Sequence, residues 1–131
     1  MRFGIGYYSL QSPPHNPIPH KQLYAEMLEQ VSAAEELGFE SAWLTEHHFI
    51  ADGYCPSLLV TAAAIAARTR KILIGTGVLL LPLHNPIKLA EDAAVVDIIS
   101  GGRLILGLGL GYRQEEFDGF GVSLKNRKGC M

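Results

Sequence analysis

Residues 45–49 include a carboxylate followed by two imidazoles, Glu46, His47 and His48. Imidazoles titrate near neutral pH, so this trio could accept, hold or donate a proton during a reaction. The trio directly follows the apolar residues 41–44, which are typical of a buried parallel strand. Functional side chains of β/α proteins collect at the carboxyl ends of strands, and we therefore predict a catalytic site at His47 and His48.

Successive side chains of an extended strand point to opposite faces, so Thr45 and His47 should share one face and Glu46 and His48 the other. If Trp43 and Thr45 point into a barrel, His47 lies over the mouth of that barrel as a general base or hydrogen-bond donor. Alternatively, both histidines are structural and bind helix or loop carbonyl groups. Adjacent residues on a strand diverge, and their spacing is not that of two metal ligands on a helix, so we predict no metal site.

Two glycine-rich segments, residues 75–78 and residues 107–111, end the third and fourth predicted strands. Glycines at these positions would let the backbone approach a flat ligand closely, although a glycine-relieved turn explains residues 75–78 as well. The second segment lacks the Gly-x-Gly-x-x-Gly spacing and follows the fourth strand rather than the first. A dinucleotide-binding fingerprint is therefore not expected.

Two further polar side chains lie near these strand ends. Arg113 could bind a phosphate group, or it could pair with Glu115 or Glu116 on a solvated turn. His84 could line the same site, or it could lie in a surface loop before a helix. The sequence leaves both pairs of alternatives open.

Strand and helix signals alternate along the whole chain. The predicted strands, apolar on both faces, cover residues 3–8, 41–46, 71–78 and 103–109. The predicted helices cover residues 20–37, 58 to about 70 and 86 to about 99. Ser57 and Asn85 are expected to cap the second and third helices, Gly101 to end the third, and Ser123 to begin a fourth.

Apolar strands separated by helices predict an α/β fold with a parallel sheet built from right-handed βαβ units. A small doubly wound sheet or part of a (β/α)₈ barrel would fit this pattern. A complete TIM barrel needs about 250 residues, and the chain has 131. We therefore predict one domain, residues 1–131, that forms about the first four βα units of a longer barrel. Four strands leave open edges and an uncovered apolar face, so self-association is expected.

The composition excludes several classes of protein. With 48% hydrophobic and 18% charged residues, the chain is globular rather than disordered. A net charge of -2 gives no basic surface for nucleic acid and no polybasic membrane signal. The longest apolar run, residues 72–83, is interrupted by glycine and proline and is too short to span a bilayer. Cys55 and Cys130 have no metal-binding spacing and are expected to be reduced thiols of a cytoplasmic protein.

The motifs together resemble the bacterial-luciferase-like flavin-dependent monooxygenase family. The resemblance covers nearly the whole chain and matches the N-terminal half of the family's barrel. Its most specific parts are Glu-His-His-Phe at residues 46–49, Gly-Thr-Gly-Val at residues 75–78 and Ser-Gly-Gly-Arg at residues 100–103. Residues 38–45, 84–86 and 109–121 also follow the family's pattern.

The resemblance implies that reduced FMN, or a deazaflavin in some branches, lies across the C-terminal mouth of a TIM-like barrel. A separate flavin reductase would supply the reduced flavin, which reacts with O₂ to oxidise a small organic substrate. His47 matches the family's catalytic histidine and His48 its neighbour. Gly77 and Val78 match a bulge that often holds a cis peptide beneath the flavin ring.

The same resemblance implies further cofactor contacts at Glu46, Gly109, Leu110 and Arg113. Gly109 matches a position that can be cysteine beside the flavin. Leu110 stands where bacterial luciferase has a phosphate-binding arginine, a charge that Arg113 could replace. The family's phosphate ligands lie on later strands, so we expect this chain alone to bind FMN weakly.

The family's dimers pack through the second and third helices, which suits the alanine-rich helix of this chain and predicts a homo-oligomer. Two other functions stay open. One is a deazaflavin-dependent dehydrogenase or reductase on the same scaffold. The other is a non-catalytic half-barrel subunit or truncated fragment.

Overall fold

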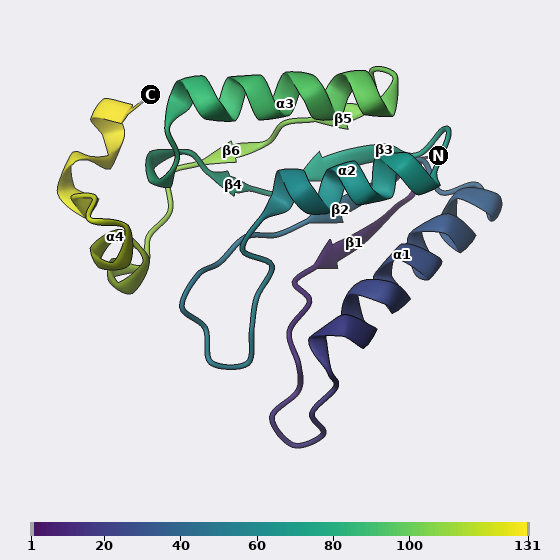
Figure 1. The fold of residues 1–131 in the computed structure, drawn as a ribbon, viewed down its shortest axis with the longest axis horizontal. Helices are drawn as coiled ribbons and strands as arrows, with labels where there is room; N and C mark the ends of the chain where they lie inside the picture. The colour runs from purple at the N-terminus through teal and green to yellow at the C-terminus, as the bar shows by residue number, and fades with distance from the viewer. Residues whose placement is uncertain (1, 131) are drawn as a thin grey trace.

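A computed structural model describes residues 2–130, and it contains a parallel sheet with helices packed on one face (Figure 1). The sheet has the strand order β1-β2-β3-β5, and these strands cover Gly4–Tyr8, Ser41–Leu44, Leu73–Thr76 and Leu104–Ile105. The helices α1, α2 and α3 connect them in turn and cover His20–Glu36, Leu58–Arg68 and Pro86–Ser100. All neighbouring strands are parallel, which confirms the predicted α/β architecture.

The predicted third and fourth strands are each divided into two. Residues 71–78 contain β3, and the chain pairs again at β4, Leu79–Leu80. Residues 103–109 contain β5 and, further on, β6 at Leu108–Gly109. β4 and β6 form a separate parallel pair at the carboxyl end of the main sheet.

The division falls at the glycine-rich segments. The Gly77–Val78 peptide bond is cis, as the family resemblance implies, and a second cis bond joins Gly6 and Tyr7. The Thr76 hydroxyl donates to the Gly107 carbonyl at 2.8 Å and accepts from the Gly107 N–H at 2.9 Å. This side chain therefore holds the two strands together where their backbone ladder stops.

The third helix begins and ends as predicted. The Asn85 side chain accepts hydrogen bonds from the N–H groups of Ile87 and Lys88 at 3.0 and 3.1 Å. Gly101 ends α3 with a φ of 71°, a left-handed conformation that glycine adopts without a steric cost. Ser57 directly precedes α2, as predicted. Its side chain makes no capping hydrogen bond, so the predicted capping interaction is wrong.

A helical segment does follow Ser123 as predicted, but it is a 3₁₀ helix, and the fourth α-helix begins earlier. Helix α4 covers Gln114–Phe120, and a 3₁₀ segment, η2, follows at Leu124–Cys130. The earlier start has a physical reason, because Phe117 is completely buried and packs in one cluster with Leu80. An apolar anchor in this position favours helix formation before residue 123.

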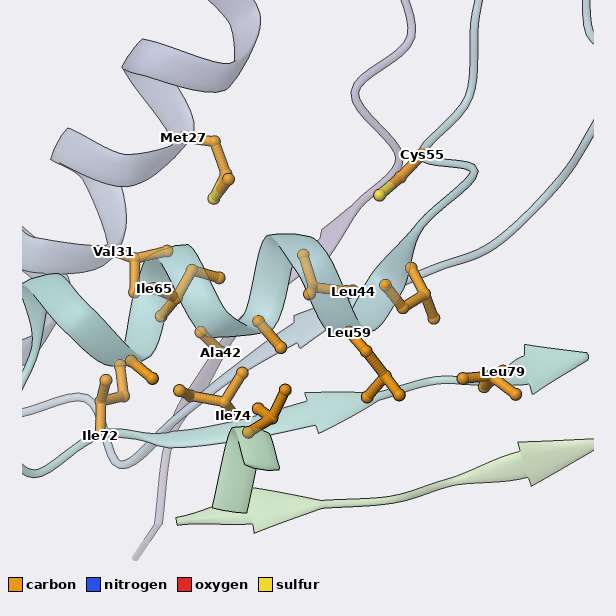
Figure 2. Close-up of a cluster of buried hydrophobic side chains, with 14 of the residues drawn as sticks. Met27, Val31, Ala42, Leu44, Cys55, Leu59, Ile65, Ile72, Ile74 and Leu79 are labelled. Carbon is orange, nitrogen blue, oxygen red and sulfur yellow. The ribbon is translucent and has the colours of Figure 1, made fainter. Parts of the chain in front are cut away.

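The main hydrophobic core lies between the helices and one face of the sheet. Figure 2 shows side chains of α1, α2, β2 and β3 pointing toward one another, among them Met27, Val31, Leu44, Ile65 and Ile74. Each is 2% exposed or less. Burial of one such aliphatic side chain contributes about 1.5–3 kcal/mol, so this cluster accounts for much of the stability of the fold.

No helix among residues 2–130 covers the opposite face of the sheet (Figure 1). Trp43 on this face is half-buried, and Tyr7 is exposed. We call it the open face. Its apolar side chains confirm the predicted uncovered surface, which the interior of a complete barrel would enclose.

Arg103 is a buried cation that joins α2, β3 and α3. The residue is 8% exposed, and its guanidinium group donates hydrogen bonds of 2.6 to 3.1 Å to backbone carbonyl groups and one hydroxyl. The acceptors belong to Ala66, Thr69, Ile72 and Ser100. The planar fork of arginine can reach all four residues at once, which a lysine cannot.

We expect Arg103→Met to destabilise the chain by about 3 kcal/mol or more, because several buried carbonyl groups would lose their donors. Urea unfolding at neutral pH measures this loss. Arg70→Met is the matched control, because Arg70 is exposed and should change the free energy of unfolding by less than about 0.5 kcal/mol. Equal stability of the two variants would contradict the role assigned to Arg103.

Across residues 2–130, none of the helices is both long and apolar enough to cross a lipid bilayer. Cys55 is a free, buried thiol. The side chain of Cys130 lies outside the part of the chain that the structure describes.

Candidate active site

The carboxyl end of β2 presents its side chains alternately to two environments. Thr45 and His47 are half-buried, whereas Glu46 and His48 are buried, as the predicted alternation requires. Phe49 then adopts a φ of 55°, which turns the chain away from the strand direction. The alternation places His47 on the side of the open face and His48 on the side of the core.

Glu116 of α4 binds this segment from the far end of the chain. Its Oε1 lies 2.7 Å from His47 Nδ1 and accepts a hydrogen bond of 2.9 Å from the His48 backbone N–H. The Glu116 side chain is 0% exposed, and its Oε2 has no partner among the described residues. The His47 side chain keeps 19% of its surface exposed.

Two tyrosines set the plane of the His47 ring. The ring of Tyr54 meets it edge-on with a centroid distance of 4.8 Å, and Tyr112 does so at 5.8 Å. The Tyr54 hydroxyl is itself 2.9 Å from the Thr45 hydroxyl. Nδ1 is bound to Glu116, and Nε2 has no hydrogen-bond partner among residues 2–130.

Glu46 forms a second buried centre on the opposite side of β2. Its carboxylate accepts from His48 Nε2–H at 3.0 Å, from His84 Nε2–H at 3.1 Å and from the Leu80 N–H at 2.6 Å. Burial alone would raise the pKa of Glu46, but these hydrogen bonds outweigh it and lower the pKa to about 2. Glu46 is therefore an anion that joins β2 to β4 and to the segment before α3.

Helix α4 is held in place by aromatic contacts. Phe117 packs in the core beside β4, and the ring of Phe120 meets the His48 ring edge-on at a centroid distance of 4.7 Å. The ring of Phe49 lies 5.8 Å from that of Phe120. These contacts fix the position from which Glu116 reaches His47.

The glycines at the strand ends accommodate neighbouring side chains. A Cβ atom on Gly75 would overlap the ring of Trp43, so this glycine makes room for a protein side chain, which supports the turn-and-packing interpretation of residues 75–78. A Cβ on Gly77 would lie 2.9 Å from the ring of Tyr7. A Cβ on Gly109 would overlap Val78.

These contacts bring the segments predicted from sequence together in one place. Tyr7 lies against Gly77, Val78 against Gly109, and Tyr112 against His47. We call these residues the rim. They surround the carboxyl ends of the strands, on the side of the molecule where α4 lies (Figure 1). The side chains of Tyr7, Val78 and Tyr112 are exposed there.

Other predicted site residues are arranged differently. Arg113 Nε lies 3.8 Å from Glu115 Oε2, which agrees with the alternative of a pair on a solvated turn. Leu110 is half-buried and carries no charge. His84 was predicted either to line the site or to lie in a surface loop. Its ring is partly exposed, as in a surface loop, but it also binds the buried Glu46. The Glu46 and His48 side chains are occupied by protein partners, so the structure lends no support to their direct contact with a ligand.

The sequence did not identify Glu116 as a partner of His47. Nearly seventy residues separate the two, and a glutamate in a short acidic helix resembles a solvated side chain. A signal is present in the neighbouring Phe117, because an apolar anchor directly after a glutamate brings that turn of helix against the core. The residues described contain no group of three or more His, Cys, Asp or Glu side chains that could hold a metal ion.

One of the grooves described lies between α2 and α3, away from His47 and Tyr112. It has a volume of about 470 Å³ and is lined mainly by apolar side chains, including Val60, Ala63, Val95 and Ile99. His84 also lines this groove. Of the rim residues, Tyr7 alone lines one of the three grooves described for residues 2–130, and that groove extends toward α1 and away from His47.

Comparisons with known proteins agree with this geometry. The family model described as luciferase-like monooxygenase matches residues 1–131. The chain is 31% identical over 131 residues to the alkanal monooxygenase alpha chain of the Kryptophanaron alfredi symbiont, which covers 100% of this chain and 36% of that protein. It is 39% identical over 98 residues to the oxygenase component of the flavin-dependent trigonelline monooxygenase of Acinetobacter baylyi, covering 75% and 27%.

Solved structures show the same fold. The monooxygenase RslO1 from Streptomyces bottropensis superposes with a TM-score of 0.91 at 35% identity, over 99% of this chain and 39% of that one. The coenzyme F420-dependent tetrahydromethanopterin reductase from Methanopyrus kandleri superposes with a TM-score of 0.68 at 29% identity, over 93% and 30%. The likeness confirms the predicted TIM-barrel type of fold, present as part of the barrel. The chain spans about a third of the length of the relatives it matches.

Proposed function

The chain belongs to the luciferase-like monooxygenase family, and we propose that it forms the N-terminal part of a flavin-dependent monooxygenase acting on a small organic substrate. One atom of O₂ would enter the substrate and the other would leave as water, with reduced flavin supplying two electrons. A separate flavin reductase would provide that flavin, as the phrase "oxygenase component" suggests for one relative. The observation that carries the proposal is the His47 imidazole, anchored at Nδ1 and open at Nε2 beside an apolar rim.

The residues at the rim fit the ring of a flavin better than its phosphate. Exposed Tyr7, Val78 and Tyr112 offer an apolar surface on which a flat ring could rest. Gly109 has no Cβ, so the Val78 side chain lies directly against its backbone and completes this surface. Leu110 has no charge and Arg113 lies near Glu115, so we propose that later strands of the full protein hold the phosphate.

Reduced FMN, when bound, would supply the chemistry that activates O₂. The part of His47 is to hold or move a proton at Nε2, the ring nitrogen that Glu116 leaves free. Tyr54 and Tyr112 restrict the imidazole to one plane and limit water around it. Glu46 and His48 would contribute indirectly, because their hydrogen bonds hold the end of β2 against β4.

Oxygen uptake tests the proposed reaction. The full-length protein that carries this chain should change the rate at which reduced FMN consumes O₂, relative to reduced FMN alone. An unchanged rate, together with no retention of flavin on gel filtration, would favour a non-catalytic subunit. The likeness to a coenzyme F420-dependent reductase supports a deazaflavin-dependent dehydrogenase as the second candidate. Substrate turnover without oxygen would identify that activity.

We also propose that a second copy of the chain covers the groove between α2 and α3. We further propose that the protein is cytoplasmic, a compartment in which the free thiol of Cys55 stays reduced. Exposed Val60, Val95 and Ile99 border the groove. The small Ala63 at its wall would allow a partner helix to approach closely. An apolar surface that continues over two helices is typical of a subunit interface.

We expect Val95→Glu to shift the protein from dimer to monomer, because a carboxylate would be buried in the interface without a partner. Light scattering coupled to size-exclusion chromatography measures the mass. Leu37→Glu is the matched control, because Leu37 is 78% exposed at the end of α1, compared with 53% for Val95, and lies away from the groove. A dimer that survives Val95→Glu would exclude this interface.

A further inference from the structure

We infer that Glu116 is a positioning residue, which keeps His47 in the tautomer protonated at Nδ1 and so leaves Nε2 unprotonated toward the rim. The use of that nitrogen in a reaction rests on the proposed function. The tautomer itself does not, since it follows from contacts within this chain. Glu116 would thus make helix α4 part of the site.

The hydrogen bonds at Glu116 Oε1 determine where the imidazole proton lies. An ionised carboxylate oxygen only accepts hydrogen bonds, so the His47 Nδ1 at 2.7 Å must carry the hydrogen. The His48 backbone N–H at 2.9 Å donates to the same oxygen and keeps it in place. The other tautomer would bring a nitrogen lone pair against this oxygen and leave the carboxylate with one donor.

Burial makes this preference strong. Glu116 is fully buried, and its second oxygen has no partner among the described residues, so the donors from the two histidine positions are the ones that offset its loss of hydration. A charged hydrogen bond in such surroundings is shorter and stronger than a neutral one, in agreement with the 2.7 Å distance. The tautomer of a histidine is set by the partner of its other nitrogen.

Nearby groups leave His47 no alternative partner for Nδ1. The His48 ring is held by Glu46 and so does not compete for Glu116. Tyr54 and Tyr112 meet the His47 ring edge-on at centroid distances of 4.8 and 5.8 Å, and neither contact offers a partner for Nδ1. Phe117 anchors α4 in the core, so Glu116 cannot withdraw without moving the helix.

Nitrogen NMR of the chain labelled with ¹⁵N-histidine tests the inference without any flavin or substrate. Near pH 8.5, about two units above the ordinary imidazole pKa, long-range ¹H–¹⁵N spectra distinguish the tautomers of the five histidines, and His47→Gln assigns the signal. We expect His47 to be almost entirely the Nδ1–H form. In Glu116→Gln that population should fall several-fold toward Nε2–H, since an amide can donate as well as accept.

Glu115→Gln is the matched control, because its exposed side chain is adjacent in sequence and should leave the His47 signals unchanged. If Glu116→Gln does not fold, Glu116→Asp replaces it in the experiment. This variant keeps the charge but moves it away from His47 by one methylene, and we expect its tautomer ratio to lie between those of the wild type and a chain without the carboxylate. A wild-type His47 in the Nε2–H form, or protonated on both nitrogens at that pH, would overturn the inference. An unchanged Nδ1–H population in a folded Glu116→Gln would also overturn it. Neither result would bear on whether the full protein is an oxygenase.

Discussion

Replacement of His47 by alanine is expected to lower turnover of the full-length protein by roughly 100- to 10,000-fold while changing flavin affinity by less than about tenfold. The imidazole is anchored at Nδ1 by Glu116 and edge-on by two tyrosines, so its free nitrogen acts on protons rather than on the bulk of the ligand. Steady-state rates at saturating reduced flavin, together with a flavin titration monitored by fluorescence, separate the two quantities.

The control for this experiment is His15→Ala, because His15 lies exposed in the loop between β1 and α1 and is not part of the rim. Its turnover should match that of the unchanged protein. If His47→Ala retains full turnover, His47 has no part in the mechanism. If flavin affinity falls as far as turnover does, the ring serves to bind the cofactor rather than to move a proton.

The arrangement of strands and helices could be predicted because the signals are local. The apolar residues within segments 3–8 and 41–46, with a helix of 3.6-residue period between these segments, specify βα units whatever the rest of the chain does. The alternation of Glu46, His47 and His48 across β2 was also predictable, since it follows from strand geometry alone. The same rule placed His47 on the face that a barrel would enclose.

The partners of these side chains could not be predicted in the same way. Glu116 binds His47 across 69 residues of sequence, and His84 binds Glu46 across 38. Both contacts depend on how elements dock, which local periodicity does not encode. The division of the third strand at Gly77 likewise depends on where Tyr7 and Thr76 meet neighbouring strands.

Substitution of Glu46 by glutamine is expected to cost about 3 kcal/mol of folding stability at pH 7. The Glu46 carboxylate is 3% exposed, and it accepts hydrogen bonds from two imidazoles and a backbone N–H. A neutral amide would weaken all three and would turn an NH₂ group toward at least one donor. Urea unfolding of the chain at pH 7 measures the difference, and Glu115→Gln should show almost none.

The pH dependence of this difference gives a sharper test. The folded-state pKa of Glu46 is about 2, below the ordinary value of 4.5, so the ionised form stabilises the fold and its contribution is complete above pH 4.5. As the pH falls from 4.5 toward 2, the carboxylate binds a proton in the unfolded chain first and this contribution disappears. The stability gap between the wild type and Glu46→Gln should therefore close over that range.

Glu35 also has a lowered pKa, so its contribution to the acid dependence of stability must be measured separately from that of Glu46. Burial alone would raise its pKa, but hydrogen bonds from the N–H groups of Ile72, Lys71 and Arg70 lower it overall. Glu35→Gln should thus show an acid-dependent gap of its own in the same direction, and the double variant with Glu46→Gln should show the sum, because these carboxylates share no partner. A gap for Glu46→Gln that stays constant from pH 7 to pH 2 would mean that the charge of Glu46 does not stabilise the join between β2 and β4.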